Sequence, residues 1–145
     1  MKITLCGSIN FAEEILKIKD QLVQKGHEVF TPQSIIDFSI KNFYDASKLK
    51  SDREKYIAET KPKYTKHHFN LIEKSDAILV VNIDKNGIKN YIGGATFAEV
   101  MVALYLNKKI FFLNQIPSDE RLSFIVDELE AAKPTVLNGN LEMIK

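Results

Sequence analysis

Short apolar runs alternate along the chain with longer segments in which apolar residues recur at helical spacing. The runs at residues 3–6, 76–82 and 110–114 are continuous, and the second is rich in β-branched side chains. Such runs are typical of parallel strands that are buried on both faces of a sheet. Shorter strands are predicted at residues 27–32, which end in a proline, and at the edge at residues 135–137.

Helices are predicted between these strands. The stripe Phe11, Ile15, Ile18, Leu22 and Val23 marks the first helix. Asn10 could cap its start, and Gly26 is expected to end it. Similar stripes predict helices over residues 64–74, 94–106 and 121–132.

Two overlapping segments before the central strand are harder to interpret. Residues 33–50 are amphipathic, which fits either a helix or a mobile helix-loop over a binding site. The charged run 48–66 is interrupted by Pro62. We predict that it forms a solvated helical face with a kink.

Alternating strands and helices predict an α/β fold for a single domain over residues 1–145. The expected architecture is a flavodoxin-like or Rossmann-like, doubly wound parallel sheet of about five strands with helices on both faces. In such sheets a ligand binds outside the carboxyl ends of the strands, at the switch point in strand order. The loops expected there are residues 7–8, 31–32, 82–92 and 114–117.

Composition narrows the function classes. Hydrophobic residues make up 45% and charged residues 27% of the chain, and the net charge of +1 gives no electrostatic case for nucleic-acid binding. The single cysteine, Cys6, excludes an internal disulfide framework and fits a reducing, cytoplasmic setting, where we expect it to be a buried strand residue. The first apolar run is too short for a signal peptide, and no run is long enough to span a membrane.

The most informative stretch lies at residues 91–99. A glycine pair, Gly93 and Gly94, opens a helix that carries Thr96 and Glu99. Glycines let a backbone approach a ligand, and the free N–H groups of a helix start favour an anion or a sugar oxygen. Glu99 could face a bound sugar, or it could complement the helix dipole from the solvent side, and spacing alone does not separate the two.

Four other residues are candidate substrate contacts. Gly7 and Ser8 end the first strand and could hold a phosphate or ribose oxygen, although a plain tight turn explains them equally well. Asp84 lies in the expected cleft loop, where polar groups bind sugar hydroxyls and where turn chemistry is the alternative. Asn114 follows a strand end on the ligand side.

Histidines and aromatic residues give weaker signals. His68 could point into the cleft as a hydrogen-bond donor or general acid, whereas a surface position is the more common fate of such a residue and of its neighbour His67. No further cysteine or histidine ligands stand at zinc-site spacing, so no metal is expected. Tyr91 and Phe97 could stack on a base or belong to the core.

Together these segments resemble the nucleoside 2-deoxyribosyltransferase superfamily, which includes the 2′-deoxynucleoside 5′-phosphate N-hydrolases. The matching segments are residues 5–9, 72–81, 94–99, 103–104 and 108–110, within roughly residues 1–115. In that family the glutamate that opens this helix is the nucleophile. The resemblance implies that Glu99 attacks the sugar of a (deoxy)nucleoside or nucleoside monophosphate, and that transfer or hydrolysis follows. It implies no cofactor, and a homo-oligomer that binds a small molecule.

The chain departs from the family pattern at helper positions. His68 stands near the place of a family acidic residue, and Asn10 stands where the phosphate-binding hydrolases have an arginine. Ile92 precedes Gly93 where transferases often have an aspartate, and the serine that the hydrolases have close to Gly93 is absent.

Two alternatives remain open. A nucleotide phosphoribohydrolase of the lysine-decarboxylase-like group has a similar glycine-rich stretch with a glutamate. Here that stretch is one residue short, Ala95 replaces a glycine, and the preceding proline is absent. The second alternative is a nucleotide-sensing module without catalysis, which the replaced helpers favour and Glu99 disfavours.

Overall fold

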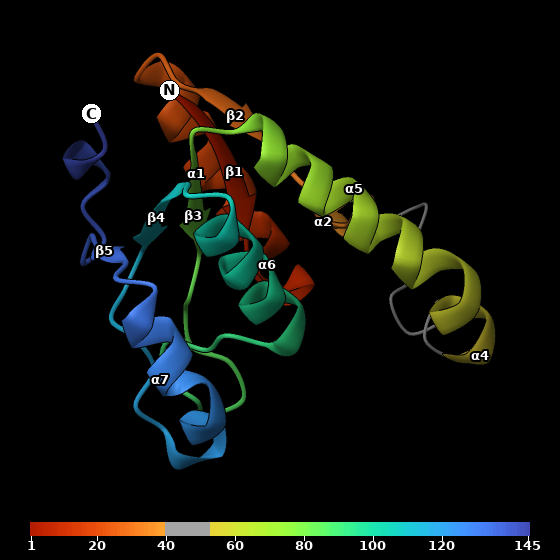
Figure 1. The fold of residues 1–145 in the computed structure, drawn as a ribbon. Coiled ribbons are helices and arrows are strands. Elements are labelled where there is room, and N and C mark those ends of the chain that lie inside the picture. Colours follow the sequence, from red (N-terminus) through yellow and green to blue (C-terminus); the bar gives the residue numbers. More distant parts are fainter. Residues whose placement is uncertain (40–52) are drawn as a thin grey trace.

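The five predicted strands form one parallel sheet. A computed structural model describes residues 1–39 and 53–145. The strands are β1 (Lys2–Cys6), β2 (Glu28–Phe30), β3 (Ala77–Val80), β4 (Lys109–Phe112) and β5 (Thr135–Val136). Their order is β2-β1-β3-β4-β5 and every neighbouring pair is parallel (Figure 1). The expected doubly wound, flavodoxin-like α/β fold is confirmed, and its switch point lies between β1 and β3.

Helices connect these strands. They are α1 (Ala12–Gln24), α2 (Gln33–Ser39), α4 (Arg53–Lys55), α5 (Lys61–Lys74), α6 (Gly94–Tyr105) and α7 (Ser123–Ala131). A π-helical turn (Tyr56–Thr60) joins α4 to α5, and single 3-10 turns stand at Ile9–Phe11, Glu120–Leu122 and Leu141–Met143. None of the helices in the described parts of the chain is long and apolar enough to cross a membrane.

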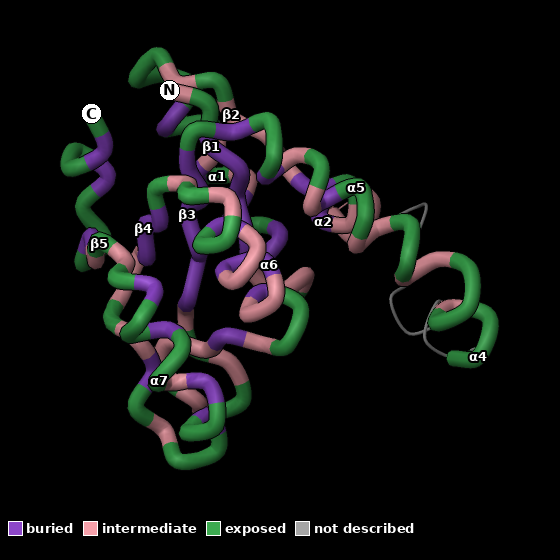
Figure 2. Tube along the Cα trace, in the orientation of Figure 1, coloured by how far each residue is buried: buried purple, intermediate pink, exposed green. Residues whose placement is uncertain are grey.

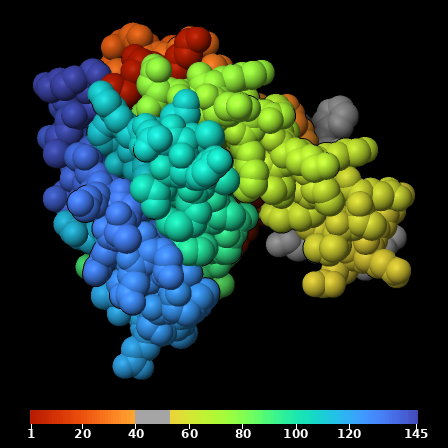
Figure 3. Space-filling model, in the orientation of Figure 1, coloured from red at the N-terminus to blue at the C-terminus, as the bar shows by residue number. Residues whose placement is uncertain are grey.

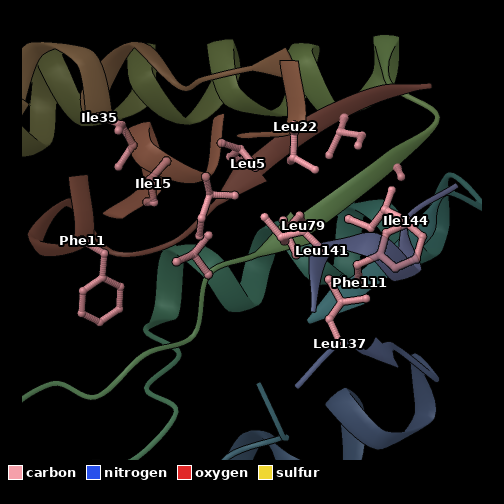
Figure 4. Packing of buried hydrophobic residues seen from close by; sticks show 14 of the residues in the cluster. Leu5, Phe11, Ile15, Leu22, Ile35, Leu79, Phe111, Leu137, Leu141 and Ile144 are labelled. Atoms are coloured by element: carbon pink, nitrogen blue, oxygen red, sulfur yellow. The ribbon is translucent and has the colours of Figure 1, made fainter. Parts of the chain in front are cut away.

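Side chains of the strands alternate between two apolar layers. Leu5 and Leu79 face a layer that also contains Ile15 and Leu22 of α1 (Figure 4). Cys6 and its neighbours on β3 and β4 face a second layer, built with α5, α6 and α7. Because both faces are covered, β3 is buried throughout, and β1 and β4 are buried beyond their first residues, Lys2 and Lys109 (Figure 2 shows this for β1 and β3). The edge strands β2 and β5 are only partly buried.

The start of the first helix differs from the prediction. Asn10 does not cap α1, which begins after Phe11 without a side-chain cap. Ser8 instead caps a 3-10 turn, where its hydroxyl accepts from the backbone N–H of Asn10 at 3.3 Å. This 3-10 turn precedes α1. The predicted end is as expected: Gly26 follows α1 with a φ of +88°, a left-handed conformation that glycine adopts without strain.

The helical segment before β3 runs without a break from Arg53 to Lys74 and extends beyond the sheet (Figures 1 and 3). Pro62 lies in the first turn of α5, where its missing N–H costs no helical hydrogen bond. The irregularity predicted near Pro62 takes the form of the π-helical turn just before it. Residues 33–39 of the ambiguous segment are helical, and residues 40–52 lie outside the described residues.

The two-layer core predicts a contrast between two phenylalanines. Phe112 is fully buried on β4, whereas Phe124 on α7 is 74% exposed. We expect Phe112→Ala to lower the free energy of unfolding by about 3 to 5 kcal/mol, because it leaves a cavity in the second layer. Phe124→Ala should change it by less than about 0.5 kcal/mol. Urea denaturation followed by circular dichroism measures both, and equal losses would contradict the assigned layers.

Candidate active site

A cavity of about 400 Å³ lies at the carboxyl ends of β1 and β3. Its walls come from the turn after β1, from α2, from α5 and its π-helical turn, and from the start of α6. The predicted site residues that line it are Gly7, Ser8, His68, Gly93, Gly94, Thr96 and Glu99. The cavity thus lies at the switch point, where this fold binds ligands.

Gly7 and Gly94 both line the cavity, but the space around them differs. A Cβ at Gly7 would lie 3.2 Å from the Val81 carbonyl oxygen and 3.1 Å from a methyl group of Ile15, so the close approach of β1 to the end of β3 favours glycine. A Cβ at Gly94 would meet nothing within 4 Å. Packing therefore does not require glycine at position 94, which lies in the cavity wall beside the first N–H groups of α6, and these have no partner within the helix.

Glu99 lies on the buried side of α6. The residue is 6% exposed, so of the two orientations open from the sequence the structure has the inward one. Its Oε1 lies 2.6 Å from His68 Nδ1. Its Oε2 is buried and has no hydrogen-bond partner among the residues that the structure describes. An acceptor left in this state costs about 1 to 3 kcal/mol, which is typical of a group that a ligand completes.

His68 is held from both sides of its ring. It is 6% exposed on α5, and its Nε2 lies 3.1 Å from the Leu5 carbonyl oxygen at the end of β1. A carbonyl oxygen only accepts hydrogen bonds, so Nε2 carries a proton and donates it. The short contact on the other side, between Nδ1 and Glu99, therefore contains one further proton that the two side chains share.

Cys6 completes the buried cluster. Its Sγ lies 3.8 Å from His68 Nε2, and the residue is fully buried, as predicted. Burial raises the pKa of the Cys6 thiol well above its usual value, and the nearby Glu99 carboxylate raises this pKa further. Cys6 is therefore a protonated thiol at neutral pH, and it is not an activated nucleophile.

The same three side chains could be considered as metal ligands. Cys6, His68 and Glu99 offer donor atoms that all lie within 4.8 Å of one another. Zinc bonds of about 2.0 to 2.1 Å to nitrogen and oxygen would separate two tetrahedral ligands by roughly 3.3 Å. The 2.6 Å between His68 Nδ1 and Glu99 Oε1 is shorter than this. The observed contacts fit hydrogen bonds better than metal coordination.

A lysine from the loop after β3 reaches the Gly-Ser turn. Lys85 Nζ donates to the Ser8 hydroxyl at 3.3 Å and lies 4.7 Å from the centre of the Tyr91 ring. Tyr91 lines the cavity, so the ring that was a weak stacking candidate stands at the site, whereas Phe97 packs in the second apolar layer. Sequence reasoning missed Lys85, because its loop position gives no periodic or motif signal.

Two predicted substrate contacts lie elsewhere. The carboxylate of Asp84 accepts from the backbone N–H of Asn90 at 3.0 Å, so it stabilises its own loop. The side chain of Asn114 donates to the carbonyl of Asn82, and Asn82 in turn bonds the backbone of Asn114 and Gln115. The structure does not bring Asp84 or Asn114 to the wall of this cavity. Asn82, fully buried, joins the loops after β3 and β4.

Comparison with known proteins adds a fold neighbour but no family. No protein-family model and no curated protein sequence matches this chain. Among solved structures, it is similar to the CMP N-glycosidase BcmB from Clostridium botulinum, with 16% sequence identity and a TM-score of 0.47. The similarity covers 94% of this chain and 85% of that chain. A similarity at this level assigns no activity.

The state of Cys6 leads to a labelling prediction. Native protein at pH 8 should not react with Ellman's reagent within hours, because the thiol is buried and its pKa is raised. The same protein in guanidinium chloride should release one equivalent of thionitrobenzoate, and Cys6→Ser provides the blank. Fast labelling of the native protein would show that the cluster opens readily to solvent.

Proposed function

We propose that this chain cleaves or transfers the N-glycosidic bond of a nucleoside or nucleoside monophosphate, with Glu99 as the nucleophile. The observation that carries the proposal is the buried Glu99 carboxylate in the cavity wall, with one oxygen bonded to His68 and the other unpartnered. A buried carboxylate with an unpartnered oxygen lowers the stability of the folded protein, and groups retained at such a cost are typical of functional sites.

The rest of the cavity suits a nucleoside. Its volume of about 400 Å³ is in the range of small-molecule sites, and aromatic side chains of Tyr64, Phe69 and Tyr91 line it beside the glycines. The flat apolar rings could hold a base, and the N–H groups at the start of α6 could bind sugar oxygens. The Tyr64 hydroxyl also donates to Asp37 at 2.6 Å, which ties α5 to α2 across the cavity wall.

The reaction would be a double displacement. Glu99 Oε2 would form a bond to the anomeric carbon while the carbon–nitrogen bond breaks and the base leaves with its electron pair. Water, or a second base, would then attack the same carbon and release Glu99, as in retaining glycosidases. The configuration at the anomeric carbon would be retained after the two inversions.

Replacing the nucleophile tests this proposal. Purified protein is incubated with a panel of purine and pyrimidine nucleosides and their 5′-monophosphates, in the ribo and deoxy series, and free base is measured by chromatography. We expect base release from at least one compound, and a loss of at least a thousandfold in Glu99→Gln. Glu128→Gln, on the exposed side of α7, is the matched control.

The pattern of the panel separates the competing functions. Release from ribonucleoside monophosphates alone, with the deoxy series untouched, would favour the phosphoribohydrolase. Nucleotide binding without release, unchanged in Glu99→Gln, would favour the sensing module. Either result would overturn Glu99 as a glycosidic nucleophile for deoxynucleosides.

Lys85 supports a substrate that carries a phosphate. It places a cation at the Ser8 hydroxyl, although Asn10 stands in place of the family arginine. We expect Lys85→Gln to raise the KM for the preferred monophosphate by roughly tenfold, the value of one charge-assisted hydrogen bond, and to leave the KM for the nucleoside unchanged. Lys89→Gln, exposed in the same loop, is the control. Equal effects of Lys85→Gln on both substrates would exclude a phosphate contact.

A further inference from the structure

The hydrogen bonds of His68 restrict where its protons lie. Because Nε2 carries a proton that it donates in a hydrogen bond to the Leu5 carbonyl oxygen, Nδ1 cannot be the protonated nitrogen of an ordinary neutral ring. The 2.6 Å contact with Glu99 Oε1 then holds a second proton, on Nδ1 or on the carboxyl group. An imidazole is a stronger base than a carboxylate, which favours an imidazolium–carboxylate pair with no net charge.

We propose that His68 is a positioning residue that keeps this proton on Nδ1 throughout the reaction and so makes Glu99 a good leaving group when the glycosyl-enzyme breaks down. The inference rests on the proposed function for its catalytic part, and on the hydrogen bonds alone for its proton. His68 acts through Glu99 and does not itself touch the substrate's reacting atoms.

The geometry argues against His68 as the acid that protonates the departing base. In a displacement the leaving group departs on the side of the anomeric carbon opposite to the nucleophile. His68 contacts the nucleophile itself, through Oε1. The proton that the base needs would therefore come from a donor on the opposite side of the anomeric carbon. Of the two roles considered for His68, hydrogen-bond donor and general acid, the geometry favours a hydrogen bond to Glu99.

The shared proton has a specific task in the second step. Once Oε2 is bonded to the sugar, Oε1 becomes the carbonyl oxygen of an ester, and it can still accept from Nδ1–H. A ring without that proton would set two lone pairs against each other at 2.6 Å. When water attacks, the sugar–Oε2 bond breaks and its electron pair returns to Glu99. The imidazolium stabilises the returning charge, and the proton that the attacking water loses restores the group that protonated the base in the first step.

The proton can be observed without any reaction. The chain has three histidines, so nitrogen-15-labelled protein gives three ring systems in two-bond proton–nitrogen spectra, which His27→Gln and His67→Gln assign. At pH 7 we expect both ring nitrogens of His68 to be protonated. In Glu99→Gln, which removes the counter-charge, one of them should lose its proton.

Two results would overturn the proton assignment. One is an unprotonated Nδ1 in the wild-type protein. The other is a doubly protonated His68 that persists in Glu99→Gln, because the charge would then not depend on Glu99. A stoichiometric metal in protein purified without chelator would also overturn it, since Cys6, His68 and Glu99 would then be ligands.

Two substitutions of His68 test the catalytic part. Asparagine places a neutral N–H donor near the position of Nδ1, so His68→Asn keeps a hydrogen bond to Glu99 and loses the charge. Glutamine places its donor near the position of Nε2, so His68→Gln keeps the bond to Leu5 and loses the one to Glu99. Circular dichroism shows whether each variant is folded.

The expected kinetics differ between the two variants. With the monophosphate that the wild-type cleaves fastest, His68→Asn should release one equivalent of base in a burst and then turn over about tenfold more slowly, the difference between a charged and a neutral donor. Intact-mass measurement should detect the sugar on Glu99. His68→Gln should be slower in both steps and show no burst.

Failure of the inference differs from failure of the proposed function. If His68→Asn loses activity without a burst and without an adduct, His68 is only a packing residue and the inference is wrong, while Glu99 can remain the nucleophile. If the wild-type releases no base from any compound, the catalytic role falls with the proposed function. The nuclear magnetic resonance result then still decides where the proton lies.

Discussion

The contact between His68 and Glu99 is the interaction on which the cavity depends. A carboxylate on the buried side of α6 is stable only when a donor compensates it, and His68 supplies that donor at 2.6 Å. The histidine is in turn fixed by the carbonyl of Leu5, at the end of a central strand. Three elements, α5, α6 and β1, thus converge on one hydrogen-bonded pair, and both members of the pair line the cavity.

The residues at the end of β1 serve both the packing of the core and the candidate site. β1 ends at Gly7, where the backbone must pass close to Val81 at the end of β3. Leu5 points into one apolar layer and Cys6 into the other, so the strand contributes core packing on both faces and a carbonyl to His68. Packing and chemistry therefore place demands on the same few residues, and a substitution at the end of β1 would affect both.

Much of this fold could be predicted from the sequence because its signals are local. Continuous apolar runs mark the strands, and the stripes of α1 and α6 follow the helical period, so the α/β order and the switch point follow. The site needs information that is not local. Glu99 could face inward or outward from spacing alone, and its partner His68 lies 31 positions earlier, in a helix that crosses to it only in the folded chain. Lys85 and Asp84 lie in one loop, and only the fold shows that Lys85 contacts the hydroxyl of Ser8, a residue of the cavity wall, whereas Asp84 bonds its own loop.

In the proposed double displacement, a positive charge on His68 would have opposite effects on the two steps. An imidazolium beside Glu99 makes the carboxylate a weaker nucleophile and a better leaving group. An acidic residue near this position, as in the family that the sequence resembles, would have the opposite effect on charge. Under the proposed function, a histidine at this position would therefore favour rapid breakdown of a glycosyl ester on Glu99. In the proposed mechanism water and a second base would break the same sugar–Oε2 bond, so a proton on His68 would speed both fates of the ester, and the choice between them would depend on which nucleophile the cavity admits.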